Sequence, residues 1–477
     1  MEKFDFDVAV IGAGSAGFAA ARTAAGAGLK TVVIEGGKQL GGLCILRGCM
    51  PSKALLYMAE VAHTVKNSGL FGVRSGKISF DFKKAMARKD LLINDFIDYR
   101  THQLNNGKFK FIRARAKFQD AHTLELKPFT ERQKPAPPAS ITAKHFVIST
   151  GSVIAPAPLC QLNDLGCLNS DSALSLKKLP KSLVVLGGGP TACELAQFFA
   201  RFGVRVTLVQ RSPHVMHDFD TDSAMVLENV FRNEGIKVFT GTKLLDAKRK
   251  GKLKSVTFEH EGKTVSVSAE QLLFALGRVA NTASLGLDKA GVKTKPNGTV
   301  ITNELMQTSA PHIYAGGDCS GPYEIVHIAI HQGEVAVHNI IKPNSAHTDY
   351  RLLLQVVFTD PQLAFVGLTE KEAVAKGIPY LASSYPFNDH GKSIIMNATD
   401  GFVKLLADPK SGEILGGLCA GPLGGELIHE IVPAMAKRMT VHELALMPHY
   451  HPTLAEIWTY PAEELAEKIP QSRSSKV

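Results

Sequence analysis

The chain has 477 residues, of which 45% are hydrophobic and 21% charged, a composition typical of a globular protein with roughly two to four domains. Its formal net charge is +10, but the Lys and Arg residues are spread along the chain without stacking aromatic residues, which argues against nucleic-acid binding. The seven cysteines show no disulfide-framework spacing, no apolar run is long enough to span a membrane, and the first residues lack the pattern of a signal peptide, so we expect a cytoplasmic protein.

The first 35 residues predict a dinucleotide-binding unit. A strand-length apolar run at 6–12 leads into three closely spaced glycines, an Ala-rich stretch to about residue 28, and a second strand at 31–35 that ends in Glu35. The glycines permit a tight turn and close approach of the backbone to a pyrophosphate, and Glu35 lies where a carboxylate accepts from ribose hydroxyls. A glycine-rich turn without a ligand is the alternative, but the strands and the acid together favour a nucleotide site. The glycines are Gly12, Gly14 and Gly17.

The next stretch carries two cysteines, Cys44 and Cys49, ahead of Pro51, Ser52 and Lys53. Positions five apart need only modest distortion of a helix to bring two Cβ atoms into disulfide range. Pro51 fits the first turn of a helix whose positive end would face Cys49, and a helix end or a nearby cation lowers a thiol pKa. This pattern favours a redox-active dithiol. A structural disulfide and two ordinary buried cysteines remain alternatives, and a zinc half-site is less consistent with the spacing.

The remaining pattern predicts a second unit of the same kind. Helices are expected at 54–70 and 79–106, strands at 108–126, a Pro-rich excursion at 127–138, and a buried strand from 145 that ends the first unit. A strand, glycine turn, helix and strand then recur at 183–210, with Ala192 in place of the third glycine. The basic run at 248–254 predicts a solvated turn between two strands. Segments at 272–278 and 312–318 predict two further strands, and from about 352 the pattern favours strands and two helices.

Two dinucleotide units imply two nucleotides, and a dithiol near one of them implies an electron relay. Taken together, these motifs resemble the class I FAD-dependent pyridine nucleotide–disulfide oxidoreductases over nearly the whole chain. Within that family the C-terminal motif His451-Pro452-Thr453 with Glu456 is most similar to the dihydrolipoamide dehydrogenase branch, and other features resemble glutathione and mercuric reductases. A flavin-binding protein used only for sensing or partner binding is the alternative from another class.

The resemblance implies an α/β fold of two Rossmann-like dinucleotide-binding domains and a C-terminal α+β dimerisation domain. It places the first part of the FAD-binding domain at 1–150, the NAD(P)-binding domain at 151–280, the return segment of the FAD-binding domain at 281–347, and the interface domain at 348–477. It further implies a homodimer that passes two electrons between NAD(P)H and a small or protein-bound disulfide, a lipoyl group among them. No metal, nucleic acid or membrane is expected.

The resemblance also implies roles for individual residues. Cys49 would face the flavin and Cys44 would exchange with the substrate, while His451, oriented by Glu456, would be the acid–base group delivered from the other subunit. Lys53 and Glu194 would pair beside the flavin. The FAD contacts expected on this basis are Gly12, Gly14, Gly17, Glu35, Gly42, Lys53, Ala116, Thr150, Gly151 and Asp318, and the NAD(P) contacts are Gly187, Gly189, Glu194, Gln210, Arg211 and Gly277.

Three positions depart from the family pattern. Leu43 stands where the family usually has Thr, and Leu46 where it usually has Asn, which removes two polar side chains near the flavin. After the strand at 204–209, Gln210 replaces the acid that usually binds the ribose 2′-OH of NAD, and Arg211 follows it. A missing acid removes repulsion of a 2′-phosphate, so we expect NADPH to be used at least as well as NADH.

Overall fold

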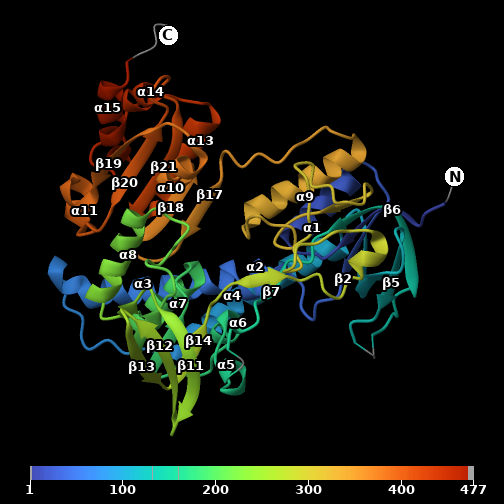
Figure 1. Cartoon of the computed structure of the whole chain (residues 1–477), viewed down its shortest axis with the longest axis horizontal. Coiled ribbons are helices and arrows are strands. Elements are labelled where there is room, and N and C mark those ends of the chain that lie inside the picture. Colours follow the sequence, from blue (N-terminus) through green and yellow to red (C-terminus); the bar gives the residue numbers. More distant parts are fainter. Residues whose placement is uncertain (1–2, 131–132, 160, 471–477) are drawn as a thin grey trace. The chain divides into compact units, whose positions relative to one another are not determined.

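The computed structural model describes residues 3–130, 133–159 and 161–470, in two compact units (Figure 1). Unit 1 consists of Met1–Ala54, Lys83–Pro156 and Gly277–Thr348, and unit 2 of Leu55–Phe82, Ala157–Leu276 and Asp349–Val477. Residues 131–132 of the predicted excursion and 471–477 of the predicted interface domain lie outside the described residues. The predicted four-part domain division stays a prediction.

Unit 1 is built on a parallel sheet. Its strands run in the order β3, β2, β1, β6, with β16 on the other side of β6 and the antiparallel pair β5–β4 extending from β6. Val8, Val10 and Val33 are fully buried, as expected of strands covered on both faces. The bounds are β1 (Phe6–Ile11), β2 (Thr31–Glu35), β3 (Lys110–Arg113), β4 (Arg115–Phe118), β5 (Thr123–Lys127), β6 (Ser140–Ile148) and β16 (Ile313–Ala315).

Two helices pack closely together in unit 1. Helices α1 (Ser15–Gly26) and α9 (Val326–Ile341) lie side by side (Figure 1). A Cβ atom on Gly333 would lie 2.3 Å from the carbonyl oxygen of Ala16, so only glycine permits this approach of the two backbones. A short antiparallel pair, β7 (Ser152–Ile154) and β15 (Arg278–Ala280), joins the second and third segments of the unit.

Three helices follow the first nucleotide-binding motif along the chain. They are α2 (Gly42–Arg47), α3 (Cys49–Asn67) and α4 (Phe82–Asn105), and a 3-10 turn at Ser68–Phe71 ends the second. The predicted helices at 54–70 and 79–106 are confirmed, but α3 starts five residues before its predicted start. The earlier start agrees with the prediction that Pro51 lies in the first turn of a helix.

Unit 2 contains a second parallel sheet, in the order β10, β9, β8, β14. Its elements are β8 (Ser182–Leu186), β9 (Arg205–Val209), β10 (Lys237–Phe239), β14 (Gln271–Phe274) and the helices α5 (Gln161–Asp164), α6 (Ser170–Ala173), α7 (Pro190–Arg201) and α8 (Thr221–Asn233). The strand–glycine turn–helix–strand pattern predicted for 183–210 is therefore confirmed.

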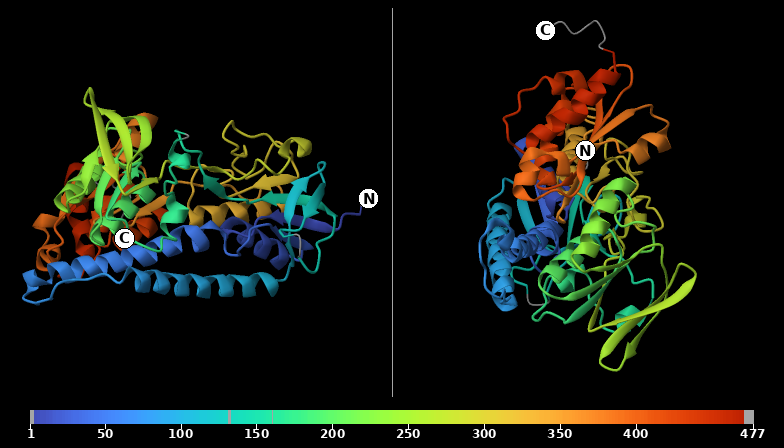
Figure 2. Two further views of the ribbon diagram at one scale, coloured as in Figure 1. Left: turned by 90° about the horizontal axis from the view of Figure 1, so that it is seen from below. Right: turned by 90° about the vertical axis from the view of Figure 1, so that its left-hand side faces the viewer.

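A three-stranded antiparallel ladder, shown in yellow-green in Figure 2, also belongs to unit 2. It consists of β11 (Lys243–Lys250), β12 (Leu253–His260) and β13 (Lys263–Ala269). The predicted turn within the basic run 248–254 is confirmed, except that Lys254 is buried rather than solvated. Its Nζ donates to the carbonyl oxygen of Gly166 and to Oε1 of Gln271, both at 2.6 Å.

The last part of unit 2 is an antiparallel five-stranded sheet in the order β17, β18, β21, β20, β19. Trp458 and Phe387 are fully buried in its core. More helices than the two predicted cover it, because most are too short to show a helical period. The bounds are β17 (Leu354–Val357), β18 (Gln362–Gly367), β19 (Leu381–Pro386), β20 (Phe402–Ala407), β21 (Ile414–Gly421), α10 (Glu370–Lys376), α11 (Gly391–Met396), α12 (Gly424–Leu427), α13 (Ile431–Ala436), α14 (Val441–Ala445) and α15 (Thr459–Lys468).

Candidate active site

The first glycine turn is held in place by Ser149 and Glu35. The Ser149 hydroxyl donates to the carbonyl oxygens of Ile11 and Gly12, each at 3.0 Å. A Cβ atom on Gly17 would lie 1.9 Å from the carbonyl oxygen of Gly12, so the start of α1 packs directly on the turn. Gly14 caps α1 without a side-chain hydrogen bond, which leaves the helix N-terminus suited to an anion.

Glu35 links the glycine turn to the loop after β2. Its Oε2 accepts from the backbone N–H of Ala13 at 2.9 Å and its Oε1 from that of Gly37 at 2.6 Å. A carboxylate oxygen has a second lone pair, so both oxygens can still accept from ribose hydroxyls. Arg113 donates to the carbonyl oxygen of Gly37 and fixes the same loop. These residues fit the adenosine end of a dinucleotide.

The dithiol segment is in backbone contact with the first glycine turn. Gly42, with φ +71°, approaches Gly14 so closely that a Cβ atom on it would lie 2.8 Å from the Gly14 Cα. The N-terminal ends of α1 and α2 therefore meet. A diphosphate held by the turn would lie beside the helix that carries Cys44.

The two cysteines lie on two different helices joined by Gly48. Cys44 is in the middle of α2, and Cys49 is the first residue of α3. A Cβ atom on Gly48 would lie 3.2 Å from the Cα of Cys44 and 3.1 Å from the carbonyl oxygen of Leu43, so glycine allows the second helix to start against the first. Pro51 occupies the first turn of α3, as predicted.

The Cys44 and Cys49 side chains form a hydrogen bond in their reduced state. This bond, and then burial, raise the pKa of the Cys44 thiol, while the charge of Lys53 acts in the opposite direction. Cys49 lies at the positive end of α3, which favours its thiolate. Because its pKa is raised, Cys44 keeps its proton until a base removes it.

The sequence analysis missed a cation near this pair. The guanidinium of Arg100, on α4, lies over the ring of Phe18 with its carbon 4.1 Å from the ring centre. Burial lowers the pKa of Arg100, and the negative charge of a Cys44 thiolate raises it. No local motif marks a single Arg in a long charged helix, so the sequence carried no signal for this neighbour.

Asp318 belongs to a polar network in unit 1. Its Oδ2 accepts from the Ser152 hydroxyl at 2.7 Å, and that hydroxyl in turn accepts from Nε of Arg278 at 2.8 Å. Burial, and then the charge of Asp318, raise the pKa of Glu324. The other residues predicted to contact FAD also lie in unit 1, where Ala116 is buried on β4 and Thr150 and Gly151 follow β6.

The second glycine turn has the geometry of the first. Gly187 has φ +120°, and a Cβ atom on it would lie 2.4 Å from the carbonyl oxygen of Ala275. Gly189 caps α7, Pro190 begins it, and Ala192 is fully buried where the first turn has glycine. A second nucleotide phosphate therefore fits here.

The end of β9 borders this turn. A Cβ atom on Gly188 would lie 2.8 Å from the Gln210 side chain, so Gln210 covers the turn, whereas the neighbouring Arg211 is exposed. Glu194 is buried on α7, where its Oε1 accepts from the backbone N–H of Phe358 at 3.0 Å. Its predicted partner Lys53 belongs to unit 1, so the Lys53–Glu194 pair stays a prediction. Gly277, which was predicted to contact NAD(P), also belongs to unit 1.

His451 and Glu456 form a hydrogen-bonded pair in unit 2. Nδ1 of His451 lies 3.0 Å from Oε2 of Glu456, and the His451 side chain is 78% exposed while that of Glu456 is 10% exposed. The carboxylate fixes the proton on Nδ1 and leaves Nε2 to accept a proton from outside. His449 is less suited, because its Nε2 lies 2.5 Å from Oε1 of Glu430 and its Nδ1 lies 3.0 Å from the carbonyl oxygen of Met447.

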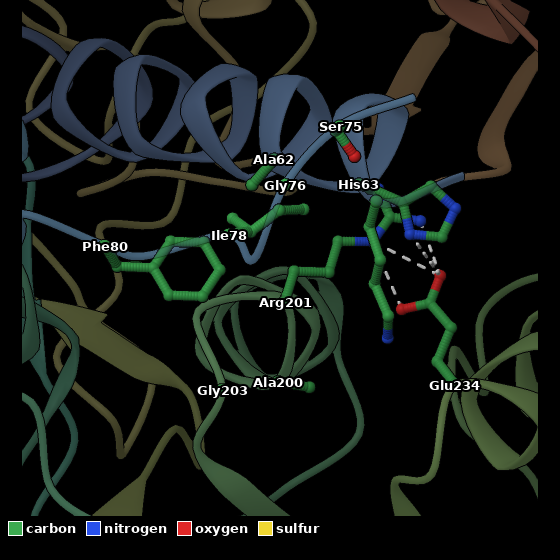
Figure 3. Close-up of a pocket in the computed structure, with 11 residues that line it drawn as sticks. Ala62, His63, Ser75, Gly76, Ile78, Phe80, Ala200, Arg201, Gly203 and Glu234 are labelled. Carbon is green, nitrogen blue, oxygen red and sulfur yellow. Dashed lines mark hydrogen bonds and ion pairs between the residues drawn. The ribbon is translucent and has the colours of Figure 1, made fainter. Parts of the chain in front are cut away.

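A pocket of about 480 Å³ in unit 2 contains none of the predicted site residues (Figure 3). It lies between α3 and α7, with Phe80 at one end. At the other end Arg201 is paired with Glu234, and His63 lies 3.9 Å from the same carboxylate. Burial, and then the charge of Arg201, lower the pKa of His63. The Arg201 and Glu234 charges balance one another, so this pocket is not assigned a ligand.

The described part of the chain lacks two further features. No cluster of three or more His, Cys, Asp or Glu side chains there is arranged to hold a metal ion. Among the same residues, no helix has the length and apolar character needed to cross a bilayer.

The fold and the site define a dinucleotide-dependent redox protein, and comparison with known proteins gives its family. Residues 6–333 match the pyridine nucleotide-disulphide oxidoreductase family, and residues 354–462 match the dimerisation domain of that family. The chain belongs to this family, and its predicted α/β fold with a C-terminal dimerisation domain is confirmed.

Individual relatives agree with this assignment. The chain is 34% identical to a dihydrolipoyl dehydrogenase of Bacillus subtilis, covering 95% of this chain and 96% of the relative, and 34% identical to the mitochondrial enzyme of Schizosaccharomyces pombe, covering 95% and 88%. Among solved structures it is similar to LpdA from Mycobacterium tuberculosis, with a TM-score of 0.86 and 27% identity over 96% of this chain and 99% of the other. It is also similar to the copper(II) complex of the HOCl-induced flavoprotein disulfide reductase RclA from Escherichia coli, with a TM-score of 0.84 and 26% identity over 97% and 100%.

The protein is therefore an FAD-dependent oxidoreductase that uses NAD(P)H in disulfide chemistry. The predicted enzyme class and cofactors are confirmed.

Proposed function

We propose that the protein passes two electrons between NAD(P)H and a disulfide substrate through Cys44 and Cys49, in the manner of a dihydrolipoyl dehydrogenase. The observation that supports this proposal most directly is the hydrogen bond between the Cys44 and Cys49 thiols, which lie on the two helices joined by Gly48. A pair held this closely needs little movement to close into a disulfide. A lipoyl group is the first substrate to test, and the cytoplasm is the expected location.

The residues of unit 1 fit FAD. Glu35 would hold the adenosine ribose, the turn at Gly14 and the adjacent Gly42 would hold the diphosphate, and Asp318 would bind the ribityl or phosphate portion. When bound, FAD would supply two-electron chemistry, taking up a hydride from the nicotinamide and reducing the Cys44–Cys49 disulfide to the dithiol.

The substrate reaction is a thiol–disulfide exchange. The Cys44 thiolate attacks one sulfur of the substrate disulfide, forms a mixed disulfide, and releases the first substrate thiolate. The Cys49 thiolate then attacks the Cys44 sulfur, closes the Cys44–Cys49 disulfide, and releases the second substrate thiolate. Because the pKa of Cys44 is raised, a base must take its proton, and Nε2 of His451 can accept it and return it to a leaving thiolate.

We further propose that the active protein is a homodimer in which His451 serves the partner's dithiol. The His451 side chain is exposed, and its neighbour Tyr450 and the nearby Leu446 are 84% and 80% exposed. Large apolar side chains exposed together typically mark a protein interface. The same residues lie within the segment that matches the family's dimerisation domain.

A substrate panel tests the proposed function. Purified flavoprotein is assayed with lipoamide, glutathione disulfide and mercuric ion as acceptors, each with NADH and with NADPH, and with dihydrolipoamide and NAD⁺ for the reverse direction. We expect lipoamide to be the best acceptor and Cys44→Ser to abolish its reduction while leaving flavin reduction by the nicotinamide intact. Preferred reduction of glutathione disulfide or mercuric ion would support the corresponding reductase instead. Full disulfide reductase activity in Cys44→Ser would refute the dithiol mechanism.

A further inference from the structure

Glu456 lies between two imidazoles, of which the sequence analysis identified only one. Nδ1 of His451 lies 3.0 Å from Oε2, and Nε2 of His390 lies 3.4 Å from Oε1 of the same carboxylate. His390 is fully buried, whereas His451 is largely exposed. A buried ring therefore faces one carboxylate oxygen, and the solvent-facing ring uses the other.

The hydrogen-bond partners of His390 fix its tautomer. Nδ1 lies 2.8 Å from the Ser393 hydroxyl oxygen, which can donate or accept. A carboxylate accepts only, so the His390 proton belongs on Nε2, towards Glu456, and Nδ1 accepts from the Ser393 hydroxyl. Burial lowers the pKa of His390, and the charge of Glu456 opposes this shift. The neutral ring in this tautomer satisfies both contacts.

The surroundings of His390 hold the ring in place. It follows the short 3-10 turn Phe387–Asp389 and is the N-cap residue of α11, which also carries Ser393. The rings of Phe387 and Tyr460 each stand edge-on to it, with ring centres 6.4 Å away and an interplanar angle of 81°. Nε2 is buried and forms no well-aligned hydrogen bond; Oε1 of Glu456 lies 3.4 Å from it, and the backbone of Thr453 is a second acceptor beside the ring.

We propose that His390 is a positioning residue for the exchange between the reduced enzyme and its disulfide substrate. The Ser393 hydroxyl fixes the His390 ring, and the ring holds Oε1 of Glu456. As a result, Oε2 of Glu456 stays directed at Nδ1 of His451. The inference rests on the proposed function, in which His451 is the acid–base group. The terminal torsion of a glutamate is broad, so a carboxylate with one partner can turn away from it. A donor on the second oxygen restricts that torsion and compensates part of the desolvation of the buried charge.

Transient kinetics on the complete flavoprotein test this role. Reduction of the flavin by the nicotinamide and reoxidation of the reduced enzyme by lipoamide, or by whichever panel disulfide is turned over, are measured separately. His390→Phe keeps an aromatic ring but removes the donor, and we expect reoxidation to slow about tenfold with flavin reduction within about twofold of wild type. His390→Gln restores an N–H near Nε2 and should recover most of the rate. His442→Phe is the matched control, because the His442 ring bonds the carbonyl oxygen of Ile469 and, among the described residues, contacts no carboxylate.

Introducing His390→Phe into the Glu456→Ala variant distinguishes a positioning role of His390 from a general structural role. If His390 acts through Glu456, His390→Phe causes no further slowing there, whereas a general structural role causes the same loss in both backgrounds and overturns the inference. Equal slowing of both half-reactions, or no difference between the Phe and Gln variants, also overturns it. Should His390→Phe fail to fold, Ser393→Ala in the two backgrounds gives the same comparison. If His451→Ala does not slow reoxidation, the proposed function itself fails, which is a distinct result.

Discussion

Gly42 and Gly14 are in backbone contact, so that a Cβ atom on Gly42 would lie 2.8 Å from the Cα of Gly14. One glycine begins the helix that carries Cys44, and the other caps the helix at the first nucleotide turn. The contact fixes the distance between the dithiol segment and the bound dinucleotide. A side chain at Gly42 would have to separate them, whereas a Cβ atom on Gly14 would lie 4.0 Å from the Gly42 Cα, an ordinary contact.

Gly42→Ala is expected to destabilise the protein and weaken its hold on FAD. An Ala at φ +71° costs about 1–2 kcal/mol, and the clash with Gly14 adds to this cost. Gly28→Ala is the matched control, because Gly28 also has a positive φ, +83°, but no atom within 4 Å of its Cβ position. The dissociation constant for FAD, measured by quenching of flavin fluorescence on titration into apoprotein, should rise at least tenfold in Gly42→Ala and less than threefold in Gly28→Ala. Equal values in the two variants would remove the role assigned to this contact.

The two cysteines should give different spectra when one is removed. Two-electron reduction of wild type is expected to produce a long-wavelength absorbance band from the Cys49 thiolate beside oxidised flavin. Cys49→Ser should lack the band, while Cys44→Ser should keep it or show it without reduction, because Cys49 lies at the positive end of α3, which favours a thiolate. Anaerobic titration with dithionite records the band, and identical spectra for both variants would contradict the assignment.

Most of the fold was predictable from local sequence patterns, and the dithiol was predictable from the five-residue spacing of Cys44 and Cys49. The apolar strand that contains Val8 and Val10 leads directly into closely spaced glycines, as a tight turn requires, so each nucleotide unit is encoded within about 30 consecutive residues. The break between α2 and α3 was not predictable, because Gly48 is needed for its close approach to Cys44 rather than for a recognisable turn.

The part of the candidate site that the sequence did not predict depends on tertiary packing. His390 lies 66 positions before Glu456 in a segment with no motif, and only the folding of α11 against the C-terminal loop brings the two together. In the same way, nothing in the basic run distinguishes buried Lys254 from its solvated neighbours. Contacts between segments distant in the chain leave no spacing for a single sequence to reveal.

Arg211 should decide the preference between the two nicotinamides. It is exposed directly after Gln210, in a position to pair with a 2′-phosphate, and no acid is present there to repel one. We expect NADPH to be used at least as well as NADH, and Arg211→Ala to raise KM for NADPH about tenfold with little change for NADH. Steady-state kinetics with both nucleotides check this. A strong preference for NADH that Arg211→Ala leaves unaltered would show that the inference is wrong.

A histidine cluster in unit 1 should make the protein sensitive to acid. His122 and His312 stack with ring centres 4.2 Å apart, and burial, and then the charge of Lys144, lower the pKa of His145 to about 4. In the unfolded chain His145 takes up a proton near pH 6.5, so the unfolded state binds more protons as the pH falls from about 6.5 towards 4 and stability decreases over that range. Between pH 7.5 and 5 the free energy of unfolding of the wild type decreases, and in His145→Gln this decrease should be smaller by about 1 kcal/mol. Urea denaturation at the two pH values measures it, and an unchanged pH dependence would exclude His145 as a cause.

Mixing inactive subunits tests whether the active site is shared across the dimer. Cys44→Ser lacks the exchanging thiol and His451→Ala lacks the proposed base, so each homodimer should be inactive with disulfides. If His451 serves its partner, a heterodimer of the two has one site with both groups intact and one with neither. Random re-pairing makes half of the dimers heterodimers, so activity should return to about a quarter of wild type. If each subunit uses its own His451, no pairing restores both groups to one site. Native mass spectrometry verifies subunit exchange, and exchange without recovered activity would refute the shared site.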